Sequence, residues 1–290
     1  MRFLAVFACV LTCLSAAAAA ACGARTGLQE ASPQAVADAG SKNDALPPVK
    51  CTPGTFELTL ASTQMMLVVD RSGSMDFDLN GQAGGGQNSR WRVLERALAP
   101  VLTALTPTVE LGAKFFPDPI GDIQVDDACA VAPATDVTPR IASASEILKV
   151  FASTRPIGGT PTSDALRITA EFLAQQDRRV LARYMVLATD GAPNCNDALN
   201  NRTCVCTGVT GGPDSCRSGP GGPSQCLDDV RAIRIVADAF SKSKVPTFVI
   251  GLGAPSELAF TRTLNNMAQA GGRPRPGPVG YYEADRKSVV

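Results

Sequence analysis

Apolar and polar residues alternate along this chain in blocks that predict strands and helices in turn. Short continuous apolar runs, which are typical of buried strands, lie at 64–70, 109–116, 183–190, 245–253 and 279–284. Apolar residues recur every three or four positions at 90–105, 143–151, 162–176, 227–243 and 256–270, which predicts helices. Strands that are apolar throughout and alternate with helices predict an α/β fold, with a doubly wound, Rossmann-like, mostly parallel sheet flanked by helices.

The apolar stripes of two helices predict which side chains are buried. In 90–105 the stripe consists of Leu94, Leu98, Val101 and Leu105, and in 227–243 it consists of Leu227, Val230, Ile233, Ala237 and Phe240. Ser143 is expected to cap the helix at 143–151. The segment 117–142 has no regular period, so we expect irregular structure there with at most a short edge strand.

The first 50 residues have a different pattern, which predicts export. Residues 1–21 contain one arginine, an apolar run and a stretch of small residues, as a signal peptide does. An uncleaved membrane helix is the alternative, and no other stretch is long and apolar enough to span a bilayer. Residues 22–50 are rich in Ala, Ser, Pro and Asp, so we expect a flexible tether there and a folded domain at 51–290.

The small-residue run ends at Cys22, and this arrangement resembles the lipidation box of bacterial lipoproteins. Ala19 departs from that pattern, because a leucine is usual three residues before the cysteine. We predict that Cys22 is lipidated and anchors an exported cell-envelope protein to a membrane, with the outer membrane expected. The alternative is cleavage at a small-x-small site, which would release a secreted or periplasmic protein.

The composition excludes several classes of function. The chain has 27 basic and 27 acidic side chains and no histidine. Balanced charge provides no basic face, so we expect no nucleic-acid partner. Without histidine, the chain by itself cannot form a Ser-His-Asp triad, a Cys-His pair or a His-ligated zinc site. A metal ion would have to be bound through oxygen or sulfur.

Three polar loops follow apolar elements of the predicted sheet. Their hydroxyl and carboxylate groups belong to Asp70, Ser72, Ser74, Thr160, Thr162 and Asp190. In doubly wound sheets, ligands bind beyond the carboxyl ends of the strands, so these groups are expected to meet at that edge. Hard oxygen donors suit Mg²⁺ or Mn²⁺, and Ca²⁺ is a third candidate. Because the set carries few charges, a bound ion would accept one more anionic oxygen, such as a carboxylate of a protein partner.

The sequences DRSGSM, GGTPT and TDG, in this order, resemble the metal-ion-dependent adhesion site of von Willebrand factor type A (VWA) domains. The resemblance covers roughly residues 60–285. It implies a sheet of about six strands with one antiparallel edge, and a metal site made of Asp70, Ser72, Ser74, Thr160 and Asp190. Ser72 and Ser74 would bind the ion directly, Thr160 directly or through water, and at least one aspartate through water. It also implies that Thr160 shifts toward the ion between two states.

Each motif also has a simpler interpretation. Ser72 and Ser74 are common turn residues, Thr160 could cap the following helix, and Asp190 could belong to an ordinary turn. A strand that ends in aspartate is also found in phosphoaspartyl transferases. Those enzymes usually need a second aspartate two residues later, where this chain has Ser72.

An insert at about 192–226 combines five cysteines with many glycines and prolines. Because an exported chain matures in an oxidising compartment, we predict disulfides among Cys51, Cys129, Cys195, Cys204, Cys206, Cys216 and Cys226. Cys204 and Cys206 are expected to have different partners. The alternative is a structural zinc site on Cys204, Cys206, Cys216 and Cys226. The insert follows Asp190 directly, so we expect it to shape the choice of partner, the alternative being a stapled loop without contacts.

The predicted function is therefore that of a metal-dependent binding or adhesion module of the cell envelope, not an enzyme. A scaffold with a vestigial metal site is one alternative. A metal-assisted hydrolase is another, but it lacks an evident general base, because histidine is absent and both site carboxylates are committed to the metal.

Overall fold

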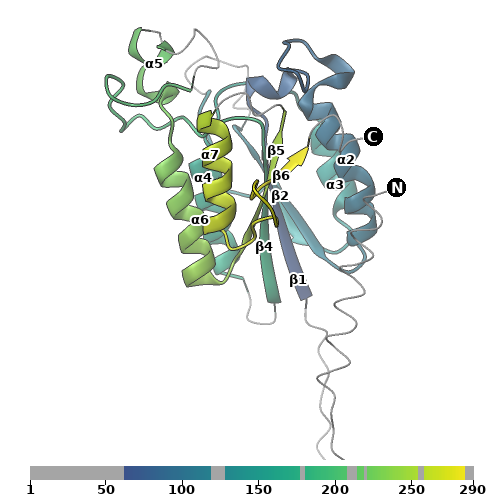
Figure 1. The fold of residues 1–290 in the computed structure, drawn as a ribbon. Helices are drawn as coiled ribbons and strands as arrows, with labels where there is room; N and C mark the ends of the chain where they lie inside the picture. The colour runs from purple at the N-terminus through teal and green to yellow at the C-terminus, as the bar shows by residue number, and fades with distance from the viewer. Residues whose placement is uncertain are drawn as a thin grey trace, which may run out of the picture. The chain divides into compact units, whose positions relative to one another are not determined.

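A six-stranded sheet forms the centre of the structure (Figure 1). The structure is a computed structural model, and it describes residues 62–118, 128–176, 180–207, 214–218, 221–253 and 258–284. The strands are β1 (Ser62–Asp70), β2 (Glu110–Phe116), β3 (Val137–Arg140), β4 (Val180–Thr189), β5 (Thr247–Leu252) and β6 (Tyr282–Ala284). They lie in the order β3-β2-β1-β4-β5-β6. All neighbours are parallel except β2 and β3, so the predicted parallel sheet with an antiparallel edge strand is confirmed.

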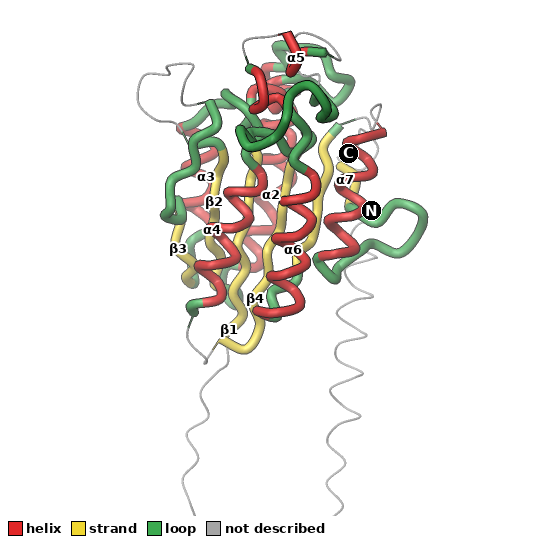
Figure 2. The backbone as a smooth tube through the Cα atoms, turned by 90° about the vertical axis from the view of Figure 1, so that its left-hand side faces the viewer, coloured by secondary structure: helices red, strands yellow, loops and turns green. Residues whose placement is uncertain are grey.

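Helices cover both faces of the sheet, as predicted (Figures 1 and 2). On one face lie α2 (Arg90–Leu105) and α3 (Ala144–Ser153), and on the other lie α4 (Thr162–Ala174), α6 (Asp229–Ser243) and α7 (Leu258–Ala270). The shorter turns are η1 (Gly73–Asp76), η2 (Gly86–Asn88), α5 (Ser215–Ser218) and η4 (Gly222–Gln225). In Figure 1 the carboxyl end of β1 points upward, toward the end of the molecule where η1 and α5 lie.

Strand β1 supplies side chains to both layers of the core. Met66 and Val68 pack on the side of α4, α6 and α7, whereas Leu67 and Val69 pack on the side of α2 and α3. Successive side chains of a strand point to opposite faces, and both faces are covered here. The continuous apolar run that predicted this strand is therefore explained by burial on its two sides.

An aromatic cluster fixes the start of α2 against the sheet and α3. The ring centroid of Trp91 lies 4.5 Å from that of Phe151 and 6.0 Å from that of Phe115. The indole nitrogen of Trp91 donates a hydrogen bond of 3.2 Å to the Phe151 carbonyl. Ser89 caps the helix, since its hydroxyl accepts from the amide of Arg92. This anchoring determines where Arg90, the first residue of α2, can place its side chain.

The predicted buried faces of α2 and α6 were wrong in part. Val101 is 40% exposed in α2, while the adjacent Leu102 is 1% exposed. In α6, Val230 and Phe240 are 77% and 41% exposed. The side chains that α6 buries instead are those of Ala232, Val236 and Ala239. Small residues let this helix pack closely against its neighbours. The prediction chose the stripe with the largest apolar side chains, and part of that stripe faces solvent.

The predicted cap of α3 was also wrong. The Ser143 hydroxyl does not accept from the helix. It donates to the carbonyls of Leu111 and Arg140, at 2.5 and 2.9 Å. The hydroxyl therefore joins the start of α3 to β2 and β3, and this tertiary contact replaces the local one.

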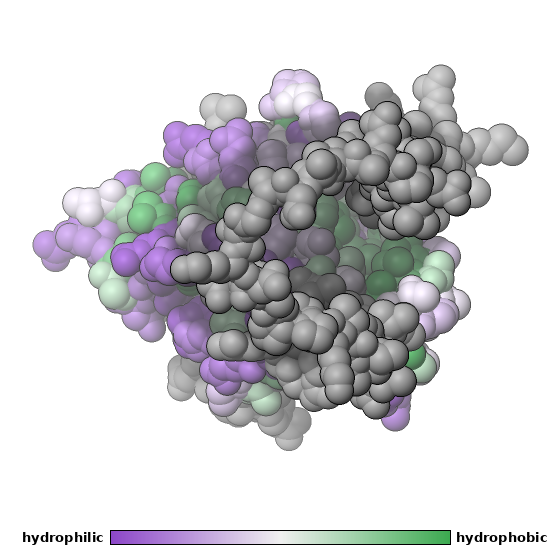
Figure 3. Space-filling model, turned by 90° about the horizontal axis from the view of Figure 1, so that it is seen from below, coloured by the Kyte–Doolittle hydropathy of each residue, from purple (hydrophilic) through white to green (hydrophobic). Residues whose placement is uncertain are grey.

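The N-terminal predictions concern residues outside the described part of the chain. These are the signal peptide at 1–21, the lipidated Cys22, the tether at 22–50, and Cys51. Among the described residues, none of the helices has the length and apolarity that crossing a bilayer requires. Figure 3 views the end of the molecule where β1 starts; hydrophilic residues are most numerous on the left, and hydrophobic ones are visible both there and toward the right. The polar loops at the end of β1 lie at the opposite end of the sheet.

Candidate metal site

Three polar loops meet at the carboxyl edge of the sheet, as the sequence predicted. Strands β1 and β4 are neighbours with Val69 opposite Ala188, so the residues that follow them leave the sheet side by side. The loop before α4 joins them through the backbone. The amide of Gly73 donates to the Gly158 carbonyl at 3.0 Å, and the amide of Ile157 donates to the Arg71 carbonyl at 2.7 Å.

Asp70 is fully buried and organises the turn that carries the two serines. One carboxylate oxygen, Oδ1, accepts from the amide of Ser72 at 2.7 Å. The other, Oδ2, accepts from the hydroxyl of Thr189. Thr189 is the last residue of β4, and sequence reasoning did not identify its role. Because both oxygens of Asp70 are engaged, this carboxylate fixes the loop geometry around the candidate site.

The hydroxyl groups of the three loops lie close together beside Asp190. The Ser72 and Ser74 hydroxyl oxygens are 3.1 Å apart, and the Ser74 hydroxyl donates to Asp190 Oδ1 at 2.9 Å. A Cβ atom placed on Gly191 would lie 3.5 Å from the Thr160 hydroxyl and 3.9 Å from that of Ser74. The structure thus brings together all five predicted residues, and all five are buried.

Asn194 holds the backbone of Thr160 from both sides. Its side-chain oxygen accepts from the backbone amide of Thr160 at 2.7 Å, and its backbone amide donates to the Thr160 carbonyl at 3.0 Å. Its side-chain nitrogen donates to the hydroxyl of Thr207 at 3.3 Å. Asn194 is four residues beyond Asp190, in a segment whose sequence reads as an ordinary loop, so no sequence signal revealed this contact.

The Cys129–Cys195 disulfide packs closely against the glycines that precede Thr160. A Cβ atom on Gly159 would lie 2.6 Å from the sulfur of Cys195 and 3.2 Å from that of Cys129. The Gly159 amide donates to the Ala128 carbonyl at 2.7 Å. Only glycine fits this approach, which gives the GG of GGTPT a physical reason. The disulfide therefore fixes the loop that presents the Thr160 hydroxyl.

The other cysteines of the insert form two further disulfides, Cys204–Cys226 and Cys206–Cys216. Cys204 and Cys206 have different partners, as predicted. The sulfur atoms of Cys204, Cys206 and Cys216 lie within 4.8 Å of one another. They are all in disulfide bonds, so the alternative of a zinc site with thiolate ligands is wrong. Figure 1 shows α5 of the insert at the end of the molecule where the candidate site lies.

The electrostatics of the site depend on a residue that sequence reasoning missed, Arg90. Its guanidinium forms an ion pair with Asp190 Oδ2. Burial raises the pKa of Asp70 to about 7, and the negative charge of Asp190 adds to this rise. Burial also raises the pKa of Asp190, and the charge of Arg90 opposes that rise. The site is thus one in which an added cation would relieve unfavourable buried negative charge.

The donor atoms fit a small divalent ion. Adjacent ligands of an octahedral ion with bonds of 2.0–2.1 Å lie about 3.0 Å apart. The observed separations are 3.1 Å between the serine hydroxyls and 2.9 Å between Ser74 and Asp190. In chemistry and spacing, the residues present therefore suit a divalent ion that prefers oxygen ligands.

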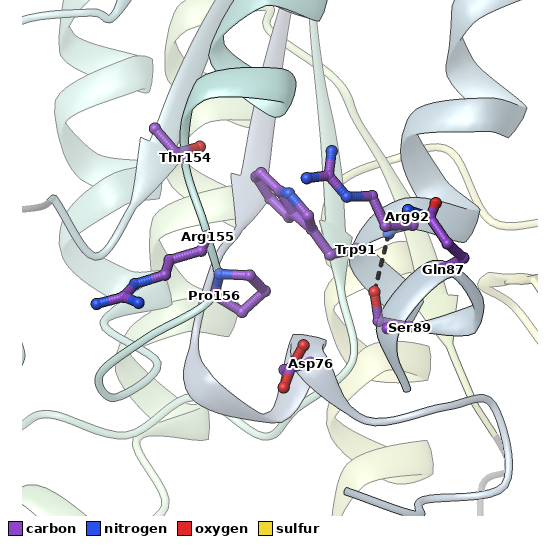
Figure 4. A pocket seen from close by; sticks show the side chains of 9 residues that line it. Asp76, Gln87, Ser89, Trp91, Arg92, Thr154, Arg155 and Pro156 are labelled. Carbon is purple, nitrogen blue, oxygen red and sulfur yellow. Dashed lines mark hydrogen bonds between the residues drawn. The ribbon is translucent and has the colours of Figure 1, made fainter. Parts of the chain in front are cut away.

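A cavity of about 370 Å³ borders η1, the segment 86–92 and the segment 154–156. Figure 4 shows the indole ring of Trp91 between Pro156 and Arg92, with Asp76 nearby. Asp76 lies two residues after Ser74, Trp91 follows Arg90, and Pro156 precedes the glycine pair. The cavity is lined by Asp76, Gly86, Gln87, Ser89, Trp91, Arg92, Thr154, Arg155 and Pro156.

Comparisons with known proteins show the fold alone. No protein-family profile and no curated protein matches the sequence. The PilB minor pilin of Streptococcus sanguinis aligns with a TM-score of 0.51 and 16% identity, over 81% of this chain and 60% of PilB. The pilus adhesin SpaC of Lactobacillus rhamnosus GG aligns with a TM-score of 0.52 and 21% identity, over 81% of this chain and 30% of SpaC.

The vWF domain of the type V pili tip protein Mfa5 from Porphyromonas gingivalis aligns less well. Its TM-score is 0.43 at 14% identity, over 79% of this chain and 91% of the domain. The alignments with PilB and SpaC, each over 81% of this chain, support the fold. The fold is VWA-like, as the three motifs implied, and the chain spans less than two thirds of PilB or SpaC.

Proposed function

We propose that this chain is a binding module of the cell envelope that engages a protein partner through a divalent ion. The ion would be Mg²⁺ or Mn²⁺, with Ca²⁺ a third candidate. The observation that carries the proposal is the meeting of five oxygen-bearing side chains from three loops at one edge of the sheet. These side chains are Asp70, Ser72, Ser74, Thr160 and Asp190.

The contacts of the site suggest a role for each ligand. Ser72 and Ser74 would bind the ion directly through their neighbouring hydroxyls. Thr160 would bind directly or through water, depending on the state of its loop. Asp70 has both oxygens engaged by Ser72 and Thr189, which favours its acting through a water molecule. The bound ion would supply an electrophile that accepts an oxygen of the partner.

The charge of the site favours a carboxylate as that oxygen. Asp70, Asp190 and Arg90 together carry a net charge of −1 when both aspartates are ionised, since two negative charges face one positive charge. A divalent ion would change the net charge to +1. A partly buried positive charge is balanced by an anionic group of a partner, and such complementarity also gives specificity. The cavity beside Trp91 offers room for a neighbouring residue of that partner.

The remaining parts of the chain are assigned by the same proposal. Residues 1–21 would direct export, Cys22 would carry the lipid that anchors the protein to the membrane, and 22–50 would tether the domain at 51–290. Export agrees with the three disulfides. The insert at 192–226 is held to the Thr160 loop by Asn194, which supports a role for it in partner choice. PilB is a minor pilin and SpaC is a pilus adhesin, which supports adhesion as the class of function.

Thermal unfolding with and without metal tests this proposal. The full chain, with its disulfides formed, should unfold at a higher midpoint in millimolar Mg²⁺ or Mn²⁺ than in chelator. An ion present at about 100 times its dissociation constant adds roughly 2.7 kcal/mol of stability. The double variant Ser72→Ala/Ser74→Ala should lose this rise, because it removes two ligands without changing any charge.

The matched control is Thr169→Ala, which removes a buried hydroxyl bonded to the Ala165 carbonyl in α4. This variant should keep the response to metal. A wild-type protein whose midpoint rises with none of Mg²⁺, Mn²⁺ and Ca²⁺ would contradict the metal site and favour a scaffold with the same fold.

A further inference from the structure

The guanidinium group of Arg90 is largely buried and is in contact with several groups of the protein. Its side chain is 11% exposed, and its Nε donates to the Asp78 carbonyl at 3.1 Å. The guanidinium carbon lies 6.0 Å from the ring centre of Phe77. A Cβ atom on Gly253 would lie 3.1 Å from that carbon, so the missing side chain there leaves room for the arginine. These contacts distinguish Arg90 from a surface arginine that meets a carboxylate by chance.

Arg90 and the proposed metal ion face the same carboxylate. One oxygen of Asp190 lies against the Ser74 hydroxyl, on the side of the candidate ligands. The other oxygen is paired with Arg90. A buried carboxylate stabilises each cation beside it, and the two cations repel each other across a poorly screened site. The arginine must therefore reduce the free energy that the ion gains by binding.

We propose that Arg90 is a resident cation that sets the metal affinity of the site. It holds Asp190 in place and neutralises its charge when no ion is bound, and it weakens binding of the ion when one enters. Occupancy of the site then follows the metal concentration around the protein, and the loaded site keeps a positive charge for an anionic partner. This inference rests on the proposed function, because it concerns the same ion.

Arg92 provides a matched comparison on the same helix. Its guanidinium is 2.8 Å from Glu95, and both side chains are partly exposed, at 32% and 23%. It is also an arginine of the first turn of α2, but its partner is not a candidate ligand. Removing its charge lowers the positive charge of α2 and keeps the ion pair between Arg90 and Asp190.

Titration calorimetry with Mn²⁺ on the full, oxidised chain tests the inference. Arg90→Gln removes the charge and keeps a group that can donate to Asp190, and it should bind Mn²⁺ roughly tenfold more tightly than wild type, or better. Arg90→Lys keeps the charge, and Arg92→Gln removes a charge elsewhere, so both should bind like wild type. If Arg90→Gln folds only with metal, both proteins are titrated in an osmolyte that keeps the variant folded without metal, because a constant taken from refolding would include the folding equilibrium.

The outcomes separate this inference from the proposed function. Equal or weaker binding by Arg90→Gln would overturn the inference, because it would mean that Arg90 does not oppose the ion. Tighter binding by Arg92→Gln, to the same degree, would overturn it as well, since any positive charge on α2 would then suffice. A wild-type protein and an Arg90→Gln variant that both bind no Mn²⁺ would overturn the proposed metal site itself.

Discussion

The double variant Cys129→Ala/Cys195→Ala is expected to lose about 4 kcal/mol of stability and to bind Mn²⁺ several-fold more weakly. The bridge joins residues 66 apart in the sequence, and opening a loop of that length costs about 4 kcal/mol in chain entropy. The second effect is specific to the site. Both sulfurs lie against Gly159, so their loss frees the residue next to Thr160. Denaturant unfolding measures the first effect, and calorimetry measures the second.

The Cys206–Cys216 disulfide is the matched control for this prediction. It lies in the same insert and joins residues 10 apart, so its removal is expected to cost about 3 kcal/mol. Gly159 has the sulfurs of Cys129 and Cys195 as its neighbours and not those of this bridge. Metal affinity should therefore stay unchanged in Cys206→Ala/Cys216→Ala. Equal losses of affinity in the two double variants would show that general loosening, rather than the position of Thr160, lowers the affinity.

The meeting of the five candidate ligands could be predicted from the sequence because sheet geometry does most of the positioning. Strands β1 and β4 are apolar on both faces, and each leads directly into an aspartate. In a parallel sheet covered by helices, the carboxyl ends of strands share one edge, so motifs far apart in the chain are placed together. Asp70 and Asp190 could thus be assigned to one site without any knowledge of their contacts.

The contacts that tune the site could not be predicted, because they join residues without a local pattern. Thr189 bonds to Asp70 across 119 positions, and Arg90 pairs with Asp190 across 100. Asn194 meets Thr160 only because the segment after β4 folds back on the loop before α4. Periodicity reports which face of an element is apolar, and it contains no information about which polar side chains from other elements meet there.

The buried face of α6 shows a related limit. The sequence offers several apolar stripes on this helix, and the one with Val230 and Phe240 has the larger side chains. The structure buries Ala232, Val236 and Ala239, since close approach to its neighbours needs small residues. Which stripe is buried depends on the space left by the partner elements, and a single helix sequence does not define that space.

The variant Asp70→Asn is expected to make the metal-free protein more stable above neutral pH. Burial raises the pKa of Asp70 to about 7 from an ordinary value of 3.8. Between these values the folded protein holds a proton that the unfolded chain releases, so the unfolding free energy of wild type falls as pH rises through this window. The upper limit of the loss is about 4 kcal/mol, from about 1.4 kcal/mol per pH unit. Asparagine carries no such proton, and its oxygen can still accept from Ser72.

Denaturant unfolding at pH 5 and pH 8, in chelator and in Mn²⁺, measures this effect. In chelator, the unfolding free energy of Asp70→Asn should rise relative to that of wild type from pH 5 to pH 8. In Mn²⁺ the order should reverse, because the ion, held through water, favours the ionised form of Asp70 over the protonated form. Wild type then gains stability with pH relative to the variant, which has lost this charge. A difference between the two proteins that is the same at both pH values in chelator would contradict a buried carboxyl with a raised pKa. Buried negative charge would then not explain the attraction of the site for a cation, and hydroxyl ligands alone would have to account for it.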